Sequence, residues 1–161
     1  MPDTGLSTQA SQVIAHLKTK EARLVTAESC TGGLIAATLT EIAGSSSVIE
    51  GGFVTYSNAM KIAALGVAEA TLEKQGAVSE ATAAEMAIGA LTNAPKANIA
   101  VAVTGVAGPD GGSSQKPVGM VCIAIQHGDE QPYVETAHFP GDRHAIRSAT
   151  VARTFELLLR L

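Results

Sequence analysis

Hydrophobic residues follow two different spacings along this chain. Short continuous apolar runs bounded by turn residues predict buried strands. These runs cover residues 23–27, 48–56, 98–104, 118–126 and 134–139. Apolar residues that recur every three or four positions, in stretches bounded by Gly, Ser or Pro, predict helices. The predicted helices cover residues 6–17, 34–42, 58–64 and 70–75, with two more that begin after Ser79 and after Asp142.

The last two helices have predicted caps and predicted buried faces. Ser79 is an expected N-cap with Glu80 in the first turn, Pro95 ends that helix, and Asp142 caps the final one. Helical spacing assigns four core-facing residues to each helix. They are Ala84, Ala87, Ile88 and Leu91 in the first, and Ile146, Ala149, Ala152 and Leu159 in the second.

The order of these elements predicts the fold class. The strand over 48–56 is expected to bend or bulge at Gly51-Gly52, and the strands over 118–126 and 134–139 are expected to form a hairpin. Because helices interleave with strands, we expect an α/β fold with helices packed on both faces of one mixed β-sheet, in three layers. With 161 residues and no linker or repeat, the chain is expected to be a single domain over residues 1–161.

Composition narrows the classes of protein that remain. Hydrophobic residues make up 46% of the chain and charged residues 16%, which is typical of a globular protein rich in tight contacts and is compatible with a homo-oligomer. The formal charge of −4, scattered basic residues and only 3% aromatic residues disfavour binding to nucleic acid. No signal peptide or apolar run long enough to span a membrane is present, and two cysteines suit a reducing compartment. We therefore expect a cytoplasmic protein.

Familiar cofactor and catalytic motifs are missing from the sequence. No two glycines are separated by a single residue, so there is no dinucleotide fingerprint, and there is no phosphate-binding loop of the Walker type. Neither a zinc-protease motif nor a serine-hydrolase elbow occurs. The four histidines lie outside the Gly- and Ser-rich segments, so we predict no metal site, no cofactor and no serine–histidine triad.

Three segments concentrate Ser, Thr and Gly at the ends of predicted elements. They are residues 28–33, residues 44–47 together with 56–61, and residues 104–112. Each segment alone reads as a plain turn. Two of them directly follow core strands, however, and ligand pockets of α/β sheets form at the carboxyl ends of strands. Together they predict one ligand pocket.

Six motifs in a fixed order resemble a known family. They are AESCTGG at 27–33, IAGSS at 42–46, GFVTYSN at 52–58, GAVS at 76–79, TGVAGPDGG at 104–112 and KPVG at 116–119. From its first strand to Arg147 the chain resembles the CinA C-terminal domain family, the nicotinamide-nucleotide amidases. Longer members of that family carry an additional N-terminal domain, so the chain resembles the stand-alone amidase form.

The resemblance implies an activity and a set of site residues. The reaction would hydrolyse the carboxamide of nicotinamide mononucleotide to nicotinate mononucleotide and ammonia, without a metal or a cofactor. The implied catalytic residues are Ser46 as nucleophile, Lys61 as base and Tyr56 as an assisting group. Arg143 and Arg147 would lie near the phosphate. The other implied substrate-binding residues are Ser29, Thr31, Gly32, Gly33, Thr104, Gly105, Ala107 and Gly108.

The chemistry of these residues is compatible with that role. A serine hydroxyl is a weak nucleophile that needs an adjacent base, and with no histidine nearby a lysine is the best base available. Lys61 lies in an apolar stretch, so burial would lower its pKa from about 10.4 and favour the neutral amine. Tyr56 could relay a proton to the leaving group. Backbone N–H groups of residues 44–47 could stabilise the oxyanion.

Several alternatives stay open from the sequence. Ser29, Ser45 and Ser47 are rival nucleophiles, and Cys30 would be one only if its pKa were lowered. The Ser113-x-x-Lys116 pair has the spacing of another serine–lysine enzyme class but lies in a Gly-rich loop, so we interpret it as coincidental. The chain could also act on a different carboxamide, or be a non-catalytic nucleotide-binding or competence-related regulatory module.

Overall fold

A computed structural model describes residues 4–161 and contains a five-stranded mixed sheet. Its strands are β1 (Leu24–Glu28), β2 (Ile49–Val54), β3 (Ile99–Gly105), β4 (Met120–His127) and β5 (Tyr133–His138). Their order is β2-β1-β3-β4-β5. The β1 strand is parallel to β2 and β3, whereas β4 is antiparallel to β3 and β5. The predicted mixed sheet and its C-terminal hairpin are therefore confirmed.

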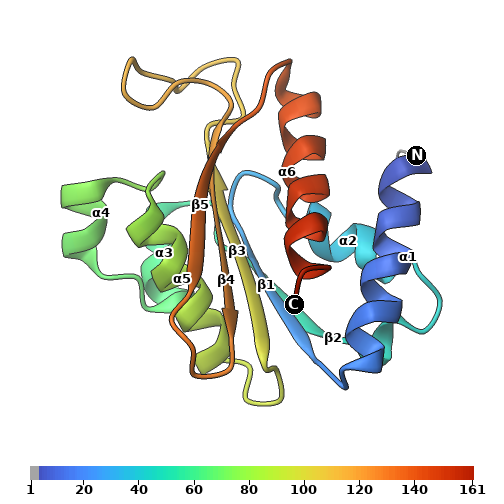
Figure 1. The fold of residues 1–161 in the computed structure, drawn as a ribbon. Helices are drawn as coiled ribbons and strands as arrows, with labels where there is room; N and C mark the ends of the chain where they lie inside the picture. The colour runs from blue at the N-terminus through green and yellow to red at the C-terminus, as the bar shows by residue number, and fades with distance from the viewer. Residues whose placement is uncertain (1–3) are drawn as a thin grey trace.

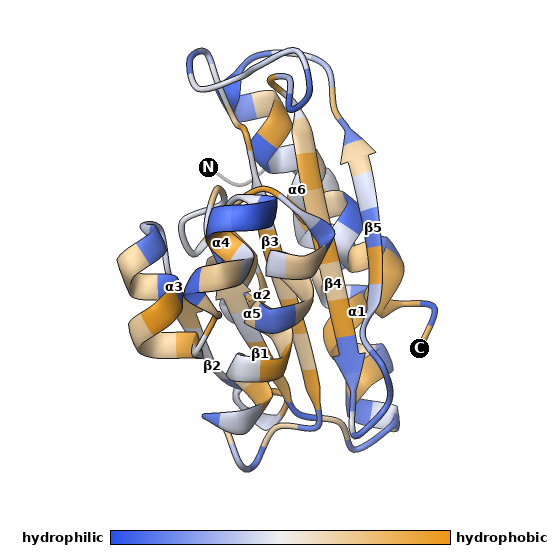
Figure 2. Ribbon diagram, turned by 90° about the vertical axis from the view of Figure 1, so that its left-hand side faces the viewer, coloured by the Kyte–Doolittle hydropathy of each residue, from blue (hydrophilic) through white to orange (hydrophobic). Residues whose placement is uncertain are grey.

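Helices cover both faces of this sheet, as predicted (Figure 1). The α-helices are α1 (Thr4–Thr19), α2 (Leu34–Thr40), α3 (Asn58–Leu65), α4 (Glu69–Gln75), α5 (Glu80–Thr92) and α6 (Arg143–Leu158). One face is covered by α1, α2 and α6, and the other by α5, with α3 and α4 packed against α5. Apolar colour runs along both β3 and β4 in Figure 2, as expected for central strands buried on both faces.

The pairing of β1 with β2 is irregular near the predicted bulge. Leu24 pairs with Ile49 but Val25 pairs with Gly51, so the strand register skips Glu50, one residue before the expected position. A Cβ atom on Gly52 would lie 2.5 Å from the Thr26 Oγ1 atom on β1. Glycine at 52 therefore allows the two strands to approach closely.

The predicted buried face of α5 is only partly right, because Ala87 is buried and Leu91 packs half-buried against the core. Ile88 is 45% exposed, and the buried side instead consists of small residues and one methionine. The buried residues are Thr82, Ala83, Met86, Ala87, Gly89 and Ala90. A Cβ atom on Gly89 would lie 1.8 Å from the carbonyl oxygen of Leu65 in α3. Because α5 packs this close to α3, small residues face inward. The spacing of the larger apolar residues therefore does not identify the buried face of α5.

The predicted face of α6 is only partly right. Ile146 is buried, and Ala152 and Leu159 are half-buried and pack against the core, whereas Ala149 lies half-buried along a groove against α1. Two threonines take core positions instead. The Thr150 and Thr154 hydroxyls donate to backbone carbonyls one turn earlier, at 2.8 Å each. This bond satisfies the hydroxyl and lets a polar residue occupy an apolar position.

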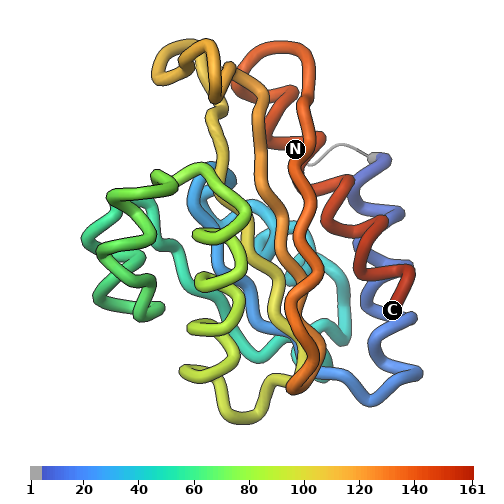
Figure 3. The backbone as a smooth tube through the Cα atoms, turned by 60° about the vertical axis from the view of Figure 1, so that its left-hand side comes forward, coloured from blue at the N-terminus to red at the C-terminus, as the bar shows by residue number. Residues whose placement is uncertain are grey.

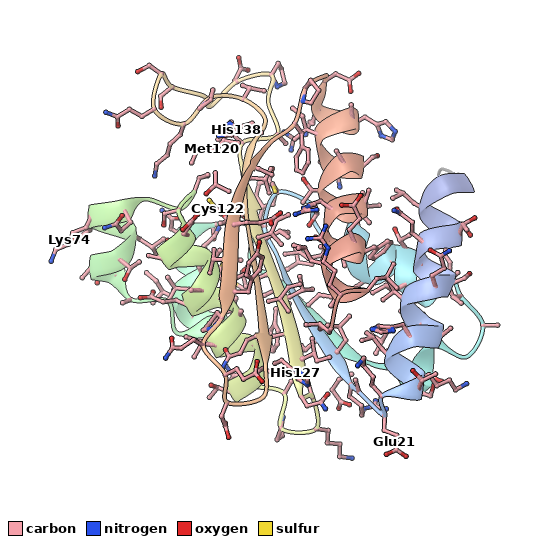
Figure 4. The ribbon with its side chains drawn as sticks, in the orientation of Figure 1. Glu21, Lys74, Met120, Cys122, His127 and His138 are labelled. Carbon is pink, nitrogen blue, oxygen red and sulfur yellow. The ribbon has the colours of Figure 1, made fainter. Side chains whose placement is uncertain are left out.

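The carboxyl ends of β1, β2 and β3 meet at one edge of the sheet, and the loop over residues 106–119 projects beyond that edge (Figure 3). His127 and His138 lie at opposite ends of the sheet (Figure 4). Among residues 4–161 there is no cluster of three or more His, Cys, Asp or Glu side chains placed to hold a metal. No helix in the same range is long and apolar enough to cross a membrane.

Candidate active site

The ammonium group of Lys61 is buried at the carboxyl ends of β1 and β2. Lys61 and Leu65 form the buried face of α3, and the Lys61 side chain is only 1% exposed. Its Nζ atom lies 3.0 Å from the Ser29 Oγ atom and 3.1 Å from each of the Thr55 and Tyr56 carbonyl oxygens. The predicted burial of Lys61 is confirmed, and its nearest hydroxyl belongs to Ser29.

This arrangement suits a neutral amine. A neutral lysine has two N–H bonds and one lone pair, and the two carbonyls can accept the two N–H bonds. The lone pair then faces the hydroxyl of Ser29 and can take its proton. Burial lowers the pKa of Lys61 below its ordinary value and outweighs the opposing effect of the nearby Cys30 side chain. Both geometry and burial therefore favour Lys61 as a base.

Ser29 is held in place by a turn that is built around the buried carboxylate of Glu28. Its Oε1 atom accepts from the Thr31 hydroxyl at 2.7 Å and from the Ile35 N–H at 2.8 Å, and its Oε2 atom accepts from the Ala36 N–H at 3.1 Å. Glu28 thus occupies the N-terminus of α2, where the sequence suggested free N–H groups for a ligand. The first turn of α2 is therefore satisfied internally.

A polar cavity of about 270 Å³ opens beside Ser29 and Lys61. The β3 end and the following loop form one wall, and residues 77–78 form another. The hydroxyl of Thr104 donates to the carbonyl of Ala77 at 2.7 Å and joins the two walls. A Cβ atom on Gly105 would lie 2.8 Å from the carbonyl oxygen of Met120, so glycine keeps this wall close to β4.

Arg143 is the guanidinium group that lines this cavity. It donates to the carbonyl of Gly108 at 2.7 Å and to the hydroxyl of Tyr56 at 2.9 Å. Arg147, one turn later in α6, instead donates to the carbonyls of Cys30 and Thr31 at 3.2 and 2.8 Å. The two arginines therefore have different surroundings, with Arg143 at the cavity and Arg147 behind the turn that carries Ser29.

Cys30 lines the cavity next to Ser29 but is poorly suited to act as a nucleophile. Burial raises the pKa of its thiol to about 11, so the thiolate is scarce at neutral pH. Within the described part of the chain its backbone N–H donates to no backbone carbonyl. That N–H directly follows Ser29, which is a suitable position for stabilising an oxyanion on a group bonded to Ser29.

Ser46 lies at the other end of the sheet from Lys61. It belongs to a short 3₁₀-helix before β2, whereas Tyr56 and Lys61 come after β2. The strand between them has six residues, or about 20 Å at ~3.3 Å per residue. Ser45 and Ser47 belong to the same 3₁₀-helix as Ser46 and lie at the same end of the sheet. The structure therefore does not bring together Ser46 and Lys61, the pair implied by the family resemblance.

The remaining implied residues divide into two groups. Six line the cavity, namely Ser29, Thr104, Gly105, Ala107, Gly108 and Arg143. Thr31, Gly32, Gly33 and Arg147 do not line it and instead belong to the turn behind Ser29 or support that turn. In the Ser113-x-x-Lys116 pair, the amine of Lys116 donates to the carbonyl of Gln75 and not to Ser113.

Sequence reasoning missed Glu28, Asn58 and Asp110. The side chains of Asn58 and Asp110 add polar groups to the cavity wall, and both residues lie within the motifs quoted above. Glu28 could have been noticed, because an acidic residue that ends an apolar strand and precedes a helix by a few residues is a common partner for helix N–H groups.

Comparison with known proteins gives consistent results. A family model described as the CinA C-terminal domain matches residues 6–161. The nicotinamide-nucleotide amidohydrolase PncC of Escherichia coli (strain K12) is 48% identical over 158 residues, covering 98% of this chain and 95% of that protein. The PncC protein of Pseudomonas putida is 47% identical over 156 residues, covering 97% and 96% respectively. The crystal structure of competence/damage inducible protein CihA from Agrobacterium tumefaciens superimposes with a TM-score of 0.95 at 45% identity, covering 100% and 99% of the two chains.

Proposed function

The chain belongs to the CinA C-terminal domain family, and from this premise we propose that it is a nicotinamide-nucleotide amidohydrolase with Ser29 as its nucleophile. The substrate would be nicotinamide mononucleotide, and the products nicotinate mononucleotide and ammonia. The observation that carries this proposal is the 3.0 Å contact between Ser29 Oγ and the buried Nζ atom of Lys61. Relatives named as this amidohydrolase are similar over nearly their whole length.

The first half of the reaction forms an ester on Ser29. Ser29 Oγ bonds to the carboxamide carbon while its proton passes to the amine of Lys61. The carboxamide oxygen becomes negatively charged, and the Cys30 N–H is suitably placed to stabilise it. The carbon–nitrogen bond then breaks, and Lys61 returns the proton to the departing nitrogen. Ammonia leaves, and the nicotinate ester of Ser29 remains.

The second half hydrolyses this ester. A water molecule gives a proton to Lys61 and attacks the ester carbon. The bond to Ser29 Oγ breaks and Lys61 returns the proton to that oxygen. The resulting carboxylic acid loses its remaining proton to solvent and is released as the carboxylate. In this proposal Ser29 takes the role that the family resemblance assigned to Ser46, and Lys61 keeps its role. The same amine acts in both halves because it can alternate between its neutral and charged forms.

The cavity also offers groups for the rest of the substrate. Arg143 is the charged donor at the cavity wall, and we assign to it the phosphate of the mononucleotide. The carbonyl oxygens and small residues of the β3 loop, over residues 104–108, lie beside the ring and ribose in this proposal.

The test is an ammonia-release assay on nicotinamide mononucleotide. We expect wild-type protein to release ammonia, and Ser29→Ala to lower kcat at least about 10³-fold, because among residues 4–161 no other hydroxyl hydrogen-bonds to Lys61 Nζ. Lys61→Met should lower kcat by about 10²–10⁴-fold, since it removes the base but keeps the apolar stem.

Ser46→Ala is the matched control, because it removes a serine hydroxyl of the same size far from Lys61. Its kcat and KM should stay within about twofold of wild type. Loss of activity in Ser46→Ala with retention in Ser29→Ala would refute the assignment of the nucleophile. Tight binding of the mononucleotide by wild-type protein without any ammonia would instead support a binding module.

A further inference from the structure

Tyr56 contributes to the site through its backbone and its side chain in different places. Its carbonyl oxygen accepts from Lys61 Nζ at 3.1 Å and lies 3.4 Å from Ser29 Oγ. Its own hydroxyl lies with Arg143, at 2.9 Å from a guanidinium nitrogen. The side chain is 59% exposed, so it leaves the buried base and reaches the cavity rim. The backbone of Tyr56 therefore contacts Lys61, whereas its side chain contacts Arg143.

Arg143 is held by uncharged groups on both sides. Its two nitrogens donate to the Gly108 carbonyl and the Tyr56 hydroxyl, and neither acceptor carries a charge. None of the ion pairs found among residues 4–161 includes Arg143. An arginine that is oriented by neutral acceptors keeps its full positive charge for a ligand, and this one lines the cavity.

We propose that Tyr56 is a positioning residue that orients Arg143 toward the phosphate of the substrate, and that its hydroxyl takes no part in proton transfer. This inference rests on the proposed function and deepens it. The hydroxyl of Tyr56 connects the end of β2 to the start of α6, and Gly108 connects the same guanidinium to the β3 loop. Three separate segments thus fix one cation at the cavity.

The contacts of Lys61 argue against a relay through this hydroxyl. In the described range its Nζ atom forms hydrogen bonds with the Ser29 hydroxyl and with the backbone carbonyls of Thr55 and Tyr56, and none with the Tyr56 hydroxyl. The Tyr56 hydroxyl accepts from the Arg143 guanidinium and is therefore directed toward Arg143 and not toward Lys61. Replacing Tyr56 by Phe keeps the backbone carbonyl that orients Lys61 and removes only the contact with Arg143. The substitution therefore separates anion binding from chemistry.

Steady-state kinetics on nicotinamide mononucleotide tests the proposal with Tyr56→Phe, Arg143→Gln and the double variant. Tyr56→Phe should raise KM about 5- to 10-fold, as expected for one charge-assisted hydrogen bond near solvent, with kcat within about twofold and an unchanged pH profile. Arg143→Gln should raise KM more. The double variant should be no worse than Arg143→Gln, because the hydroxyl acts through the arginine.

Tyr133→Phe is the matched control, because Tyr133 is the other tyrosine, is similarly exposed, and donates its hydroxyl proton to Glu135 at 2.8 Å. Its kinetics should equal those of wild type. A fall in kcat of more than about 100-fold in Tyr56→Phe with unchanged KM would overturn the proposal and restore a proton-transfer role. Effects of Tyr56→Phe and Arg143→Gln that multiply in the double variant would also overturn it.

Calorimetric titration with ribose 5-phosphate gives a readout that needs no turnover. Weaker binding by about fivefold in Tyr56→Phe, and by more in Arg143→Gln, supports the positioning role. Equal binding by wild type and Tyr56→Phe contradicts it. If wild-type protein released no ammonia but bound ribose 5-phosphate in this pattern, the proposed function would fail while the positioning role of Tyr56 stood.

Discussion

Lys61 occupies a position in α3 where the packing calls for an apolar residue. It shares the buried face of the helix with Leu65, while Met60 and Ile62 on either side are exposed. The exchange places an amine in the core and apolar side chains in solvent. Such an arrangement disfavours the charged form of the amine, which a catalytic base must lose. A core position of α3 is therefore occupied by a lysine instead of an apolar residue, and its burial favours the neutral form that can accept a proton.

The first prediction concerns the pH dependence of the reaction. In the proposed mechanism the base is neutral Lys61, so kcat/KM should rise about tenfold per pH unit while the lysine is protonated and level off once it is neutral. Because burial lowers the pKa of Lys61 from 10.5, the midpoint should lie below that of a solvated lysine. Initial rates from about pH 6 to about pH 10 measure it.

Lys61→Arg is the control for this profile. An arginine remains protonated throughout that range, so the variant should be inactive at every pH rather than shifted. A profile that falls as pH rises through the midpoint would mean that the protonated lysine is the active form, and the base assignment would then be wrong.

At the scale of the element, the turn from β1 into α2 depends on one buried carboxylate. Glu28 is 1% exposed and receives three hydrogen bonds from the turn and from the first helical turn of α2. The α2 helix has no side-chain N-cap of its own, since Gly33 occupies that position. Glu28, at the end of β1, therefore acts as the N-cap of α2 by accepting its first N–H groups. The same contacts fix the backbone at Ser29.

The second prediction follows from that contact. Glu28→Ala should lower the free energy of unfolding by about 2–4 kcal/mol, because it leaves one buried N–H group, one half-buried N–H group and a buried hydroxyl without acceptors. It should also lower activity, since the turn that carries Ser29 loses its anchor. Urea unfolding and the ammonia assay measure the two effects.

Glu41→Ala at the other end of α2 provides the comparison. Glu41 is the exposed C-cap residue, where a carboxylate lies at the unfavourable end of the helix dipole. Its removal should leave stability within about 0.5 kcal/mol of wild type or raise it slightly. Equal stability of Glu28→Ala and wild type would show that the carboxylate is not needed for the turn.

The elements were predictable from the sequence because their signals are local, whereas the contacts between them were not. Apolar runs and caps such as Ser79 and Asp142 located the strands and helices to within about two residues. Which serine meets Lys61 depends instead on the direction of β2, which separates Ser46 from it by the length of a strand. Hydrophobic spacing also misplaced Ile88 on α5, where close packing at Gly89 selects small residues.

At the scale of the whole molecule, the change of strand direction in the sheet completes the cavity. The three parallel strands end at the same edge, and the antiparallel return of β4 sends the loop over 106–119 across that edge. This loop carries the Gly108 carbonyl that holds Arg143, and it is bonded to α4 through Lys116. The geometry of the cavity therefore depends on how firmly the loop is held.

The third prediction tests the link between this loop and α4. The amine of Lys116 donates to the carbonyl of Gln75 at the last turn of α4, next to the cavity wall at residues 77–78. Lys116→Ala should free the loop and raise KM for the mononucleotide about 3- to 10-fold, because binding must then order the loop. Since neither Ser29 nor Lys61 is disturbed, kcat should stay within about twofold.

Lys74→Ala separates this effect from the loss of a positive charge. Lys74 lies in the last turn of α4, as Gln75 does, but its side chain points away from the sheet into solvent (Figure 4). Both variants remove one lysine from the same part of the surface, so any general electrostatic attraction for the phosphate falls equally. A rise in KM confined to Lys116→Ala would therefore come from the tether, and an equal rise in both variants would assign the effect to charge alone.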